Sequence, residues 1–259
     1  MNTKKIIICL IYFAFMTFQL SAQKGSWTIG LNSGLRGELF DASQHYRLYF
    51  FGNKISFPPI EFNLSYGIND NFFIETGITY IETKTNWGFG TIDWGMEGRY
   101  CAQYKLYSSL QLPVNLKYNL PLFHSRFHLF TKVGLNIQIP LQKIRNLNFN
   151  ADPVYMEYDG YSYKLEYNLD VTAPNHPINF LISTGIGCNY QFKNGIGISL
   201  FGEYFTGLRT MANIRIPYTL VNMDIGLSPD WYDDEYITYR GDYWYAGLGI
   251  SYTFQKKRE

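Results

Sequence analysis

The chain closes on the stretch Tyr243-Trp244-Tyr245-Ala246-Gly247-Leu248-Gly249-Ile250-Ser251-Tyr252-Thr253-Phe254, followed by a short charged tail. From Trp244 onward, apolar residues occupy every second position, and small or polar residues and Tyr245 stand between them. A period of two is typical of a β-strand with one apolar face and one small or polar face. The stretch also has about the length that a tilted strand needs to cross a bilayer. It therefore predicts a membrane-spanning strand.

The composition favours strands over helices as the membrane-crossing elements. The chain has 259 residues, of which 19% are aromatic and 23 are tyrosine, yet its mean hydropathy is slightly negative at −0.17. Beyond the N-terminus, no run approaches the ~18 consecutive apolar residues of a spanning helix. These properties exclude a helical membrane bundle and suit a β-barrel, whose apolar residues alternate with polar ones.

The N-terminus has the pattern of a secretory signal. Lys4 and Lys5 precede an apolar run at 6–18, and Ser21-Ala22-Gln23 offers small residues for cleavage. The run is too short for an uncleaved anchor. We therefore predict a cleaved signal peptide over residues 1–22 and a single outer-membrane β-barrel domain over 23–259. Removing the two lysines takes the formal charge from +1 to −1, so nucleic acid is not an expected partner.

Seven earlier segments repeat the alternation of the closing strand. Together with residues 243–254 they give eight strands, an even number that lets an antiparallel barrel close without an open edge. The predicted segments are 26–36, 57–66, 72–84, 102–118, 127–139, 178–192 and 196–206.

The connections between these strands alternate between short and long. The short ones are Gly67–Asn71, Asn119–Arg126 and Lys193–Gly195, the last containing the hairpin signal Asn194-Gly195. The long ones cover 37–56, 85–100, 140–177 and 207–242. This alternation predicts an all-β fold, an eight-stranded antiparallel transmembrane up-and-down β-barrel with three short periplasmic turns, four long external loops and periplasmic termini.

A soluble up-and-down barrel of the lipocalin kind is the structural alternative, because alternation alone does not say which face points inward. The polar face is rich in glycine, serine, asparagine and glutamine, which suits a packed hydrophilic interior. Aromatic residues also gather at strand ends, as the interfacial girdle of a membrane barrel requires. They are Trp27, Tyr66, Phe72, Tyr118, Phe127, Tyr190, Phe192, Trp244 and Phe254.

Nearly the whole mature chain resembles the small outer-membrane β-barrel domain family of Gram-negative bacteria, often labelled porin-like. The matching pieces are Ser21-Ala22-Gln23, Leu112-Pro113-Val114-Asn115-Leu116-Lys117-Tyr118 and the closing run Gly247–Phe254. In such barrels a C-terminal aromatic is an assembly signal, which the resemblance places at Tyr252 and Phe254. It implies outer-membrane lipid and the barrel-assembly machinery as partners. The family has no shared activity, so no functional residue transfers.

Charged residues on the polar face form a predicted network inside the barrel. An eight-stranded barrel is filled by its own side chains, and charges in such an interior must pair. The network serves either as a structural salt-bridge core or as a gate or proton path. Its seven members would leave about one positive charge to be solvated or bound near an end. They are Arg36, Glu61, Glu75, Lys105, Lys117, Lys132 and Glu203.

The third and fourth long connections hold tyrosines and tryptophan among carboxylates. Such clusters can stack on and hydrogen-bond sugars, hold a cation or contact a protein, or they can simply cap the barrel. The binding candidates are Tyr155, Tyr158, Tyr161, Trp231, Tyr232, Asp233 and Asp234.

Enzymatic chemistry has little support in the sequence. It has no phosphate loop, no CxxC pair and no metal-spaced histidine or cysteine set, so no cofactor or metal site is predicted. A hydrolase or acyltransferase using His176 with a nearby serine is one alternative, but no nucleophile–base spacing supports it. A narrow channel or a transport accessory is another. The main hypothesis is a non-enzymatic barrel that binds an extracellular ligand or partner, or has a structural role in the envelope.

Overall fold

A computed structural model describes most of the chain after the predicted signal peptide, and residues 1–22 lie outside it. Every helix-or-strand element within the described residues is a β-strand. Among those residues, none forms a helix long and apolar enough to cross a membrane. The described ranges are 25–39, 41–42, 48–51, 55–56, 58–69, 71–91, 97–122, 126–142, 147–150, 153–158, 160–172, 178–224 and 229–254.

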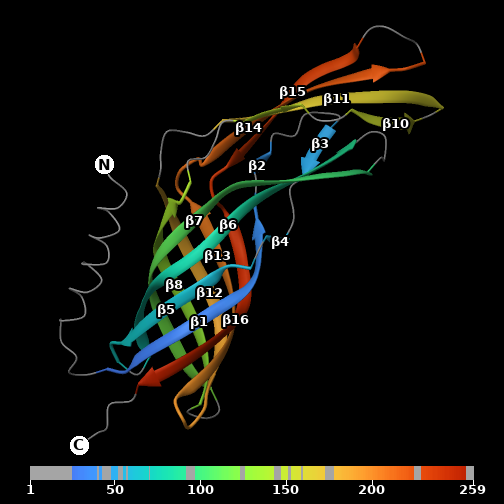
Figure 1. The fold of residues 1–259 in the computed structure, drawn as a ribbon. Coiled ribbons are helices and arrows are strands. Elements are labelled where there is room, and N and C mark those ends of the chain that lie inside the picture. Colours follow the sequence, from blue (N-terminus) through green and yellow to red (C-terminus); the bar gives the residue numbers. More distant parts are fainter. Residues whose placement is uncertain are drawn as a thin grey trace, which may run out of the picture.

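Eight antiparallel strands form a closed barrel, which confirms the predicted fold class (Figure 1). Each strand pairs with the next in the series, and the last pairs with the first. The barrel strands are β1 (Trp27–Glu38), β5 (Ile60–Gly67), β6 (Phe72–Thr91), β7 (Glu97–Leu122), β8 (Phe127–Pro140), β12 (Asn179–Gln191), β13 (Ile196–Gly207) and β16 (Tyr243–Phe254).

The seam between β1 and β16 closes the barrel over the full length of both strands. Pairing runs from Trp27 opposite Phe254 to Glu38 opposite Tyr243. Gly34 lies opposite Gly247, and a Cβ atom on Gly34 would collide with the backbone carbonyl oxygen of Ala246. Glycine is therefore required here because the two backbones approach too closely for any side chain.

All three short connections lie at the end of the barrel where β1 begins and β16 ends (Figure 1). They link β5 to β6, β7 to β8 and β12 to β13 (Figure 1). In the last of them Gly195 has a φ of 88°, and the Phe192 amide donates to the Ile196 carbonyl at 2.7 Å. The Asn194-Gly195 hairpin is thus confirmed, because glycine adopts this left-handed backbone without steric cost.

The outside of the barrel is an apolar belt, and the inside is polar. This distribution excludes the soluble alternative, because a barrel in water would bury its apolar face instead. It is the surface of a membrane-spanning barrel. The exposed members of the belt include Leu31, Leu35, Ile60, Phe62, Ile74, Ile78, Val114, Leu116, Val133, Leu135, Ile182, Ile186, Ile198, Leu200, Leu248 and Ile250.

Aromatic rings mark the turn end of the belt in contacting pairs. The centroids of Trp27 and Tyr66 lie 4.8 Å apart, and those of Phe72 and Tyr118 lie 4.9 Å apart. Trp244 stands towards the opposite end of β16. From Trp244 to Phe254 the strand rises about 33 Å, which at a tilt of about 40° is roughly 25 Å across the membrane. The belt therefore has the height of a membrane barrel.

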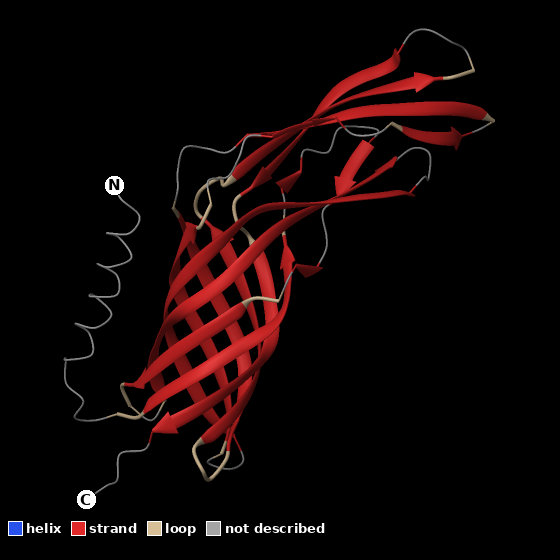
Figure 2. Ribbon diagram, in the orientation of Figure 1, coloured by secondary structure: helices blue, strands red, loops and turns tan. Residues whose placement is uncertain are grey.

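The four long connections are present as predicted, but they contain strands where loops were expected. β6 and β7 continue beyond the barrel, and β3 (Leu48–Phe51) pairs with the projecting part of β6. β4 (Ile55–Ser56) pairs with β1. A separate six-stranded sheet, here named the outer sheet, rises beyond the same mouth (Figure 2). It consists of β2 (Asp41–Ala42), β9 (Leu147–Asn150), β10 (Val154–Tyr158), β11 (Tyr161–Thr172), β14 (Ala212–Asn222) and β15 (Pro229–Tyr239).

The outer sheet is amphipathic for the same reason as the barrel strands. In β14 the side chains of Ile214, Ile216 and Tyr218 are buried, whereas Arg215 between them is exposed. β11 follows the same rule, with Leu165, Tyr167 and Val171 buried. Each segment was long enough to show a period of two, and that signal would have identified both strands from the sequence. One face of the outer sheet is therefore buried and the other is available.

Candidate functional site: the charged interior and the outer sheet

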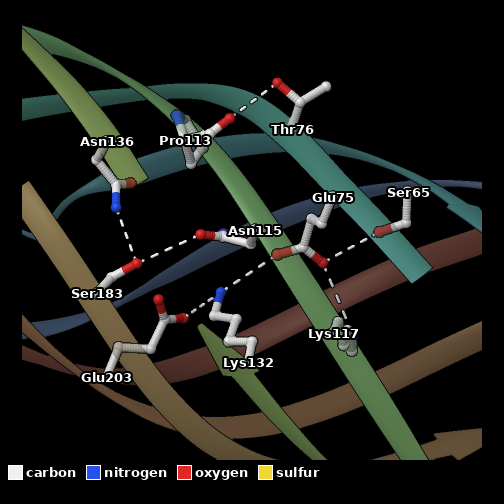
Figure 3. A network of polar contacts seen from close by, with 10 residues as sticks. All are labelled: Ser65, Glu75, Thr76, Pro113, Asn115, Lys117, Lys132, Asn136, Ser183 and Glu203. Atoms are coloured by element: carbon white, nitrogen blue, oxygen red, sulfur yellow. Dashed lines mark hydrogen bonds and ion pairs between the residues drawn. The ribbon is translucent and has the colours of Figure 1, made fainter. Parts of the chain in front are cut away.

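A lysine between two glutamates forms the centre of the barrel interior (Figure 3). The Nζ atom of Lys132 on β8 lies 2.5 Å from a carboxylate oxygen of Glu203 on β13 and 3.2 Å from one of Glu75 on β6. All three side chains are buried. Strand alternation places them inside, because each lies an even number of residues from the other polar residues that face the interior on its strand. All three belong to the predicted network of seven.

Glu75 also has partners on two other strands (Figure 3). The hydroxyl of Ser65 donates to its carboxylate at 3.0 Å, and the Nζ atom of Lys117 lies 3.7 Å away. A second chain of hydrogen bonds lies beside it, in which Asn136 donates to the Ser183 hydroxyl at 2.8 Å. Ser183 in turn donates to the Asn115 side-chain oxygen at 3.3 Å. These bonds tie β5, β6, β7, β8, β12 and β13 together across the interior.

The interior charges do not balance as the sequence predicted. Glu61 is buried on β5, opposite Asn32 of β1. Lys105 lies on the outer part of β7, where its backbone pairs with Lys84, and its side chain lies outside the described residues. Arg36 forms its ion pair with Glu38 and not with this interior group. The described interior group therefore holds Glu61, Glu75 and Glu203 against Lys117 and Lys132, a surplus of one carboxylate rather than one positive charge.

Arg36 belongs to a second cluster at the barrel mouth. Its guanidinium lies 2.6 Å from the carboxylate of Glu38 and 4.0 Å from the ring centroid of Tyr243. The Tyr239 hydroxyl donates to Glu38 at 2.7 Å, and the Tyr243 hydroxyl donates to Gln111 at 2.6 Å. Burial and the neighbouring Glu38 carboxylate raise the pKa of Tyr239 well above its usual value. The cluster joins the barrel to β15.

Sequence reasoning missed Glu38 and Tyr243, although a signal was present for both. Glu38 lies two residues after Arg36 on β1, and Tyr243 lies two residues before Tyr245 on β16, so each shares a strand face with a residue already predicted to point inward. The same signal identifies the aromatic residues that fill the interior. Their rings pack in pairs, with centroids 4.3 Å apart for Phe205 and Tyr243 and 4.9 Å apart for Phe201 and Tyr245.

The interior is packed almost completely. Lys117 lies over the ring of Phe130, with its Nζ atom 4.2 Å from the centroid. A void among the described residues between Glu61, Glu203, Tyr243 and Tyr245 has a volume of only ≈ 10 Å³. That volume is about the minimum that one water molecule needs. The barrel axis therefore offers no continuous aqueous path at this level.

The described residues contain no metal-binding group of three or more His, Cys, Asp or Glu side chains. His176, the residue of the hydrolase alternative, lies outside the described residues. The predicted assembly signal is described: Tyr252 and Phe254 are exposed on the outside of β16, with centroids 5.0 Å apart.

The predicted loop candidates lie together in the outer sheet. Tyr155 and Tyr158 are on β10 and Tyr161 begins β11, while Trp231, Tyr232, Asp233 and Asp234 are on β15. β14 lies between β11 and β15 and joins the two groups into one sheet. Tyr155 and Tyr161 are exposed. For Tyr158, Trp231, Tyr232 and Asp233, only the backbone position is described.

A groove of ≈ 590 Å³ lies on this sheet, at a place that the sequence did not single out. Its volume is within the usual range for small-molecule sites. Near one end of the lining, the Nη2 atom of Arg215 lies 2.7 Å from the carboxylate of Asp234. The groove is lined by Asn148, Asp170, Val171, Thr172, Asn213, Ile214, Arg215, Tyr236, Ile237 and Thr238.

Comparison with solved structures finds outer-membrane barrels. The outer membrane protein OprG of Pseudomonas aeruginosa has a TM-score of 0.47 and 12% identity, covering 90% of this chain and 98% of that one. The attachment invasion locus protein Ail of Yersinia pestis has a TM-score of 0.34 and 13% identity, and the match covers 90% of this chain and 100% of that one. The outer membrane protease OmpT of Escherichia coli has a TM-score of 0.37 and 9% identity, and the match covers 90% of this chain and 99% of that one. At these values the likeness assigns no activity or ligand.

No family model and no curated protein matches the chain. The features that bear on its role are therefore its own: a packed, charged interior and a sheet with a groove beyond one mouth of the barrel.

Proposed function

We propose that this chain is an integral, non-enzymatic outer-membrane protein, in which a closed barrel holds the outer sheet in place for binding an extracellular ligand or partner. The observation that carries the proposal is the contrast between the two compartments. The void beside the interior ion pairs has the volume of about one water molecule, whereas the outer sheet has a groove of ligand size.

The position of the outer sheet supports this role. It lies beyond the mouth opposite the three short turns, whereas the start of β1 and the end of β16 lie at the turn end (Figure 1). In outer-membrane barrels short turns face the periplasm and long connections face outward. We therefore place the termini in the periplasm and the groove outside the cell.

The interior supports a scaffold more than a channel. Ion pairs and hydrogen bonds tie opposite walls together, and stacked aromatic rings fill the remaining space. Opening a path would require breaking buried ion pairs, each of which costs several kcal/mol to separate.

The experiment compares the full protein with a variant in which 147–172 and 212–239 are each replaced by a short Gly-Ser turn. Both proteins are purified in detergent and tested against arrays of oligosaccharides and of cell-surface proteins. We expect the variant to keep the altered gel migration of an unheated, folded barrel and to lose every specific array signal. Equal binding by both proteins would contradict the proposal, as would the absence of any signal from the full protein.

A further inference from the structure

Two rows of side chains cross the exposed face of the outer sheet. In the first row Asn148, Asp170, Arg215 and Tyr236 are aligned by the pairing of β9, β11, β14 and β15. In the second row Thr172, Asn213 and Thr238 are aligned two residues further along the same strands. Because side chains alternate across a sheet, both rows lie on one face. Val171, Ile214 and Ile237 lie between the two rows; they also line the groove, although they are almost fully buried.

Hydrogen bonds within the rows orient these groups. The Asn148 amide donates to the Asp170 carboxylate at 2.6 Å. Arg215 donates from two nitrogens to a single oxygen of Asp234, at 2.7 and 3.1 Å. The Thr172 hydroxyl donates to the Asn213 carbonyl at 3.2 Å. These bonds restrict the side-chain conformations of Asn148, Asp170, Thr172 and Arg215 before any ligand arrives, which lowers the entropic cost of binding.

The charges and the aromatic ring narrow the class of ligand. Asp234 compensates Arg215, and Asp170 adds a further negative charge, so the groove does not favour an anion. Amide, hydroxyl and carboxylate side chains share the groove with apolar carbon surface, and such a mixed lining suits a ligand that has both polar groups and C–H faces. Tyr236 is 51% exposed, which leaves much of its ring surface accessible at the edge of the polar row.

We propose that this groove binds a neutral oligosaccharide. The Asp170 carboxylate and the Asn148 and Asn213 amides provide the paired donors and acceptors that adjacent sugar hydroxyls require. The Tyr236 ring provides a flat apolar surface for the C–H face of a sugar ring. This inference rests on the proposed function and specifies its ligand class and its site.

The test uses the full-length protein in detergent, with short glucan, mannan and galactan oligosaccharides and their sulfated counterparts as probes. The strongest neutral binder is then titrated by calorimetry. We expect neutral probes to bind and sulfated ones to bind more weakly. Tyr236→Ala and Asp170→Ala should each weaken binding about tenfold or more, because the first removes the stacking surface and the second removes a charged hydrogen-bond acceptor.

Matched variants separate a specific site from general damage. Tyr236→Phe keeps the ring and should retain most of the affinity. Glu166→Gln changes an exposed carboxylate of β11 that lies outside the groove, so it should not change affinity. Unheated gel migration and resistance of the outer sheet to protease verify folding.

Two results would overturn the oligosaccharide inference. One is unchanged binding in folded Tyr236→Ala and Asp170→Ala. The other is no binding of any neutral probe, while the full protein still captures a cell-surface protein that the trimmed variant does not capture. The second result would leave the proposed function standing, so the failure of one is distinguishable from the failure of the other.

Discussion

Glu61 and Glu75 are both buried carboxylates inside the barrel, but their surroundings differ. Glu75 lies between Lys117 and Lys132 and accepts a hydrogen bond from Ser65. Glu61 has no ion pair within 4 Å among the described residues and faces Asn32 across the β1–β5 pair. With one carboxylate in surplus, Glu61 is the member whose charge the interior compensates least.

We expect Glu75→Gln and Glu61→Gln to have opposite consequences for stability. The first leaves Lys117 without its ion pair, and removing one partner of a buried pair costs about 3–5 kcal/mol. Lys117 is partly exposed, so the loss should lie at or below the lower end. The second removes the surplus charge and should leave stability unchanged or raise it. Urea unfolding in lipid vesicles measures both.

The reverse order of the two midpoints would contradict this assignment of the surplus charge. The same two variants also separate a structural network from a gate. A structural network predicts that neither substitution raises ion conductance, whereas a gate held by Glu75 would open when that carboxylate is neutralised.

At the scale of the element, the β1–β16 seam leaves no space for a side chain at Gly34. We expect Gly34→Ala to destabilise the barrel by about 1–3 kcal/mol, because the added methyl group collides with a carbonyl oxygen on β16. Gly202→Ala on β13 is the matched control, because a Cβ atom there meets nothing within 4 Å. The fraction that migrates as folded barrel on unheated gels measures both. Equal effects of the two substitutions would contradict the close backbone approach at Gly34.

Deleting Trp244–Phe254 removes the whole closing strand. β1 and β13 would then lose their partner, leaving two open edges in the hydrocarbon region, where unpaired backbone groups cost several kcal/mol each. We expect no assembled barrel in membrane fractions. A soluble, folded truncated product would contradict the membrane-spanning assignment.

β14 is the central strand of the outer sheet, and its buried face decides whether that sheet forms. Ile216 is fully buried, so Ile216→Asp would bury an unpaired charge and should unfold the outer sheet. Thr219→Asp changes the opposite face of the same strand and should be tolerated. Limited proteolysis measures whether the outer sheet is folded, and migration on unheated gels measures whether the barrel is folded. Joint loss of sheet and barrel in Ile216→Asp would show that the two are not separable.

At the scale of the whole molecule, the barrel spans the membrane without an open channel through its described interior. A void of ≈ 10 Å³ does not hold a column of water, and ion pairs cross the lumen beside it. We expect no steady single-channel current from the unmodified protein in planar bilayers at neutral pH. Large, stable, ion-selective currents would overturn the packed interior and make the channel alternative the leading one.

The sequence by itself determined the barrel. Strand alternation follows from the pleat of the backbone, so each predicted segment carries its own evidence for an inside and an outside. The Asn194-Gly195 turn and the aromatic pairs at the strand ends are local in the same sense, as is the division into short and long connections. Even the missed strands β11 and β14 had this local signal.

Only the tertiary structure decided which charges meet and where a ligand fits. Lys132 joins Glu75 and Glu203, which come from separate strands, and Arg36 turns to Glu38 rather than to that group. The groove needs β9, β11, β14 and β15 in one register, although β12 and β13 separate β11 from β14 along the chain. Alternation along a strand places a side chain on one face of the sheet. Its partners are determined by strand register and by its depth along the barrel, and both depend on pairings between segments that are distant in the sequence.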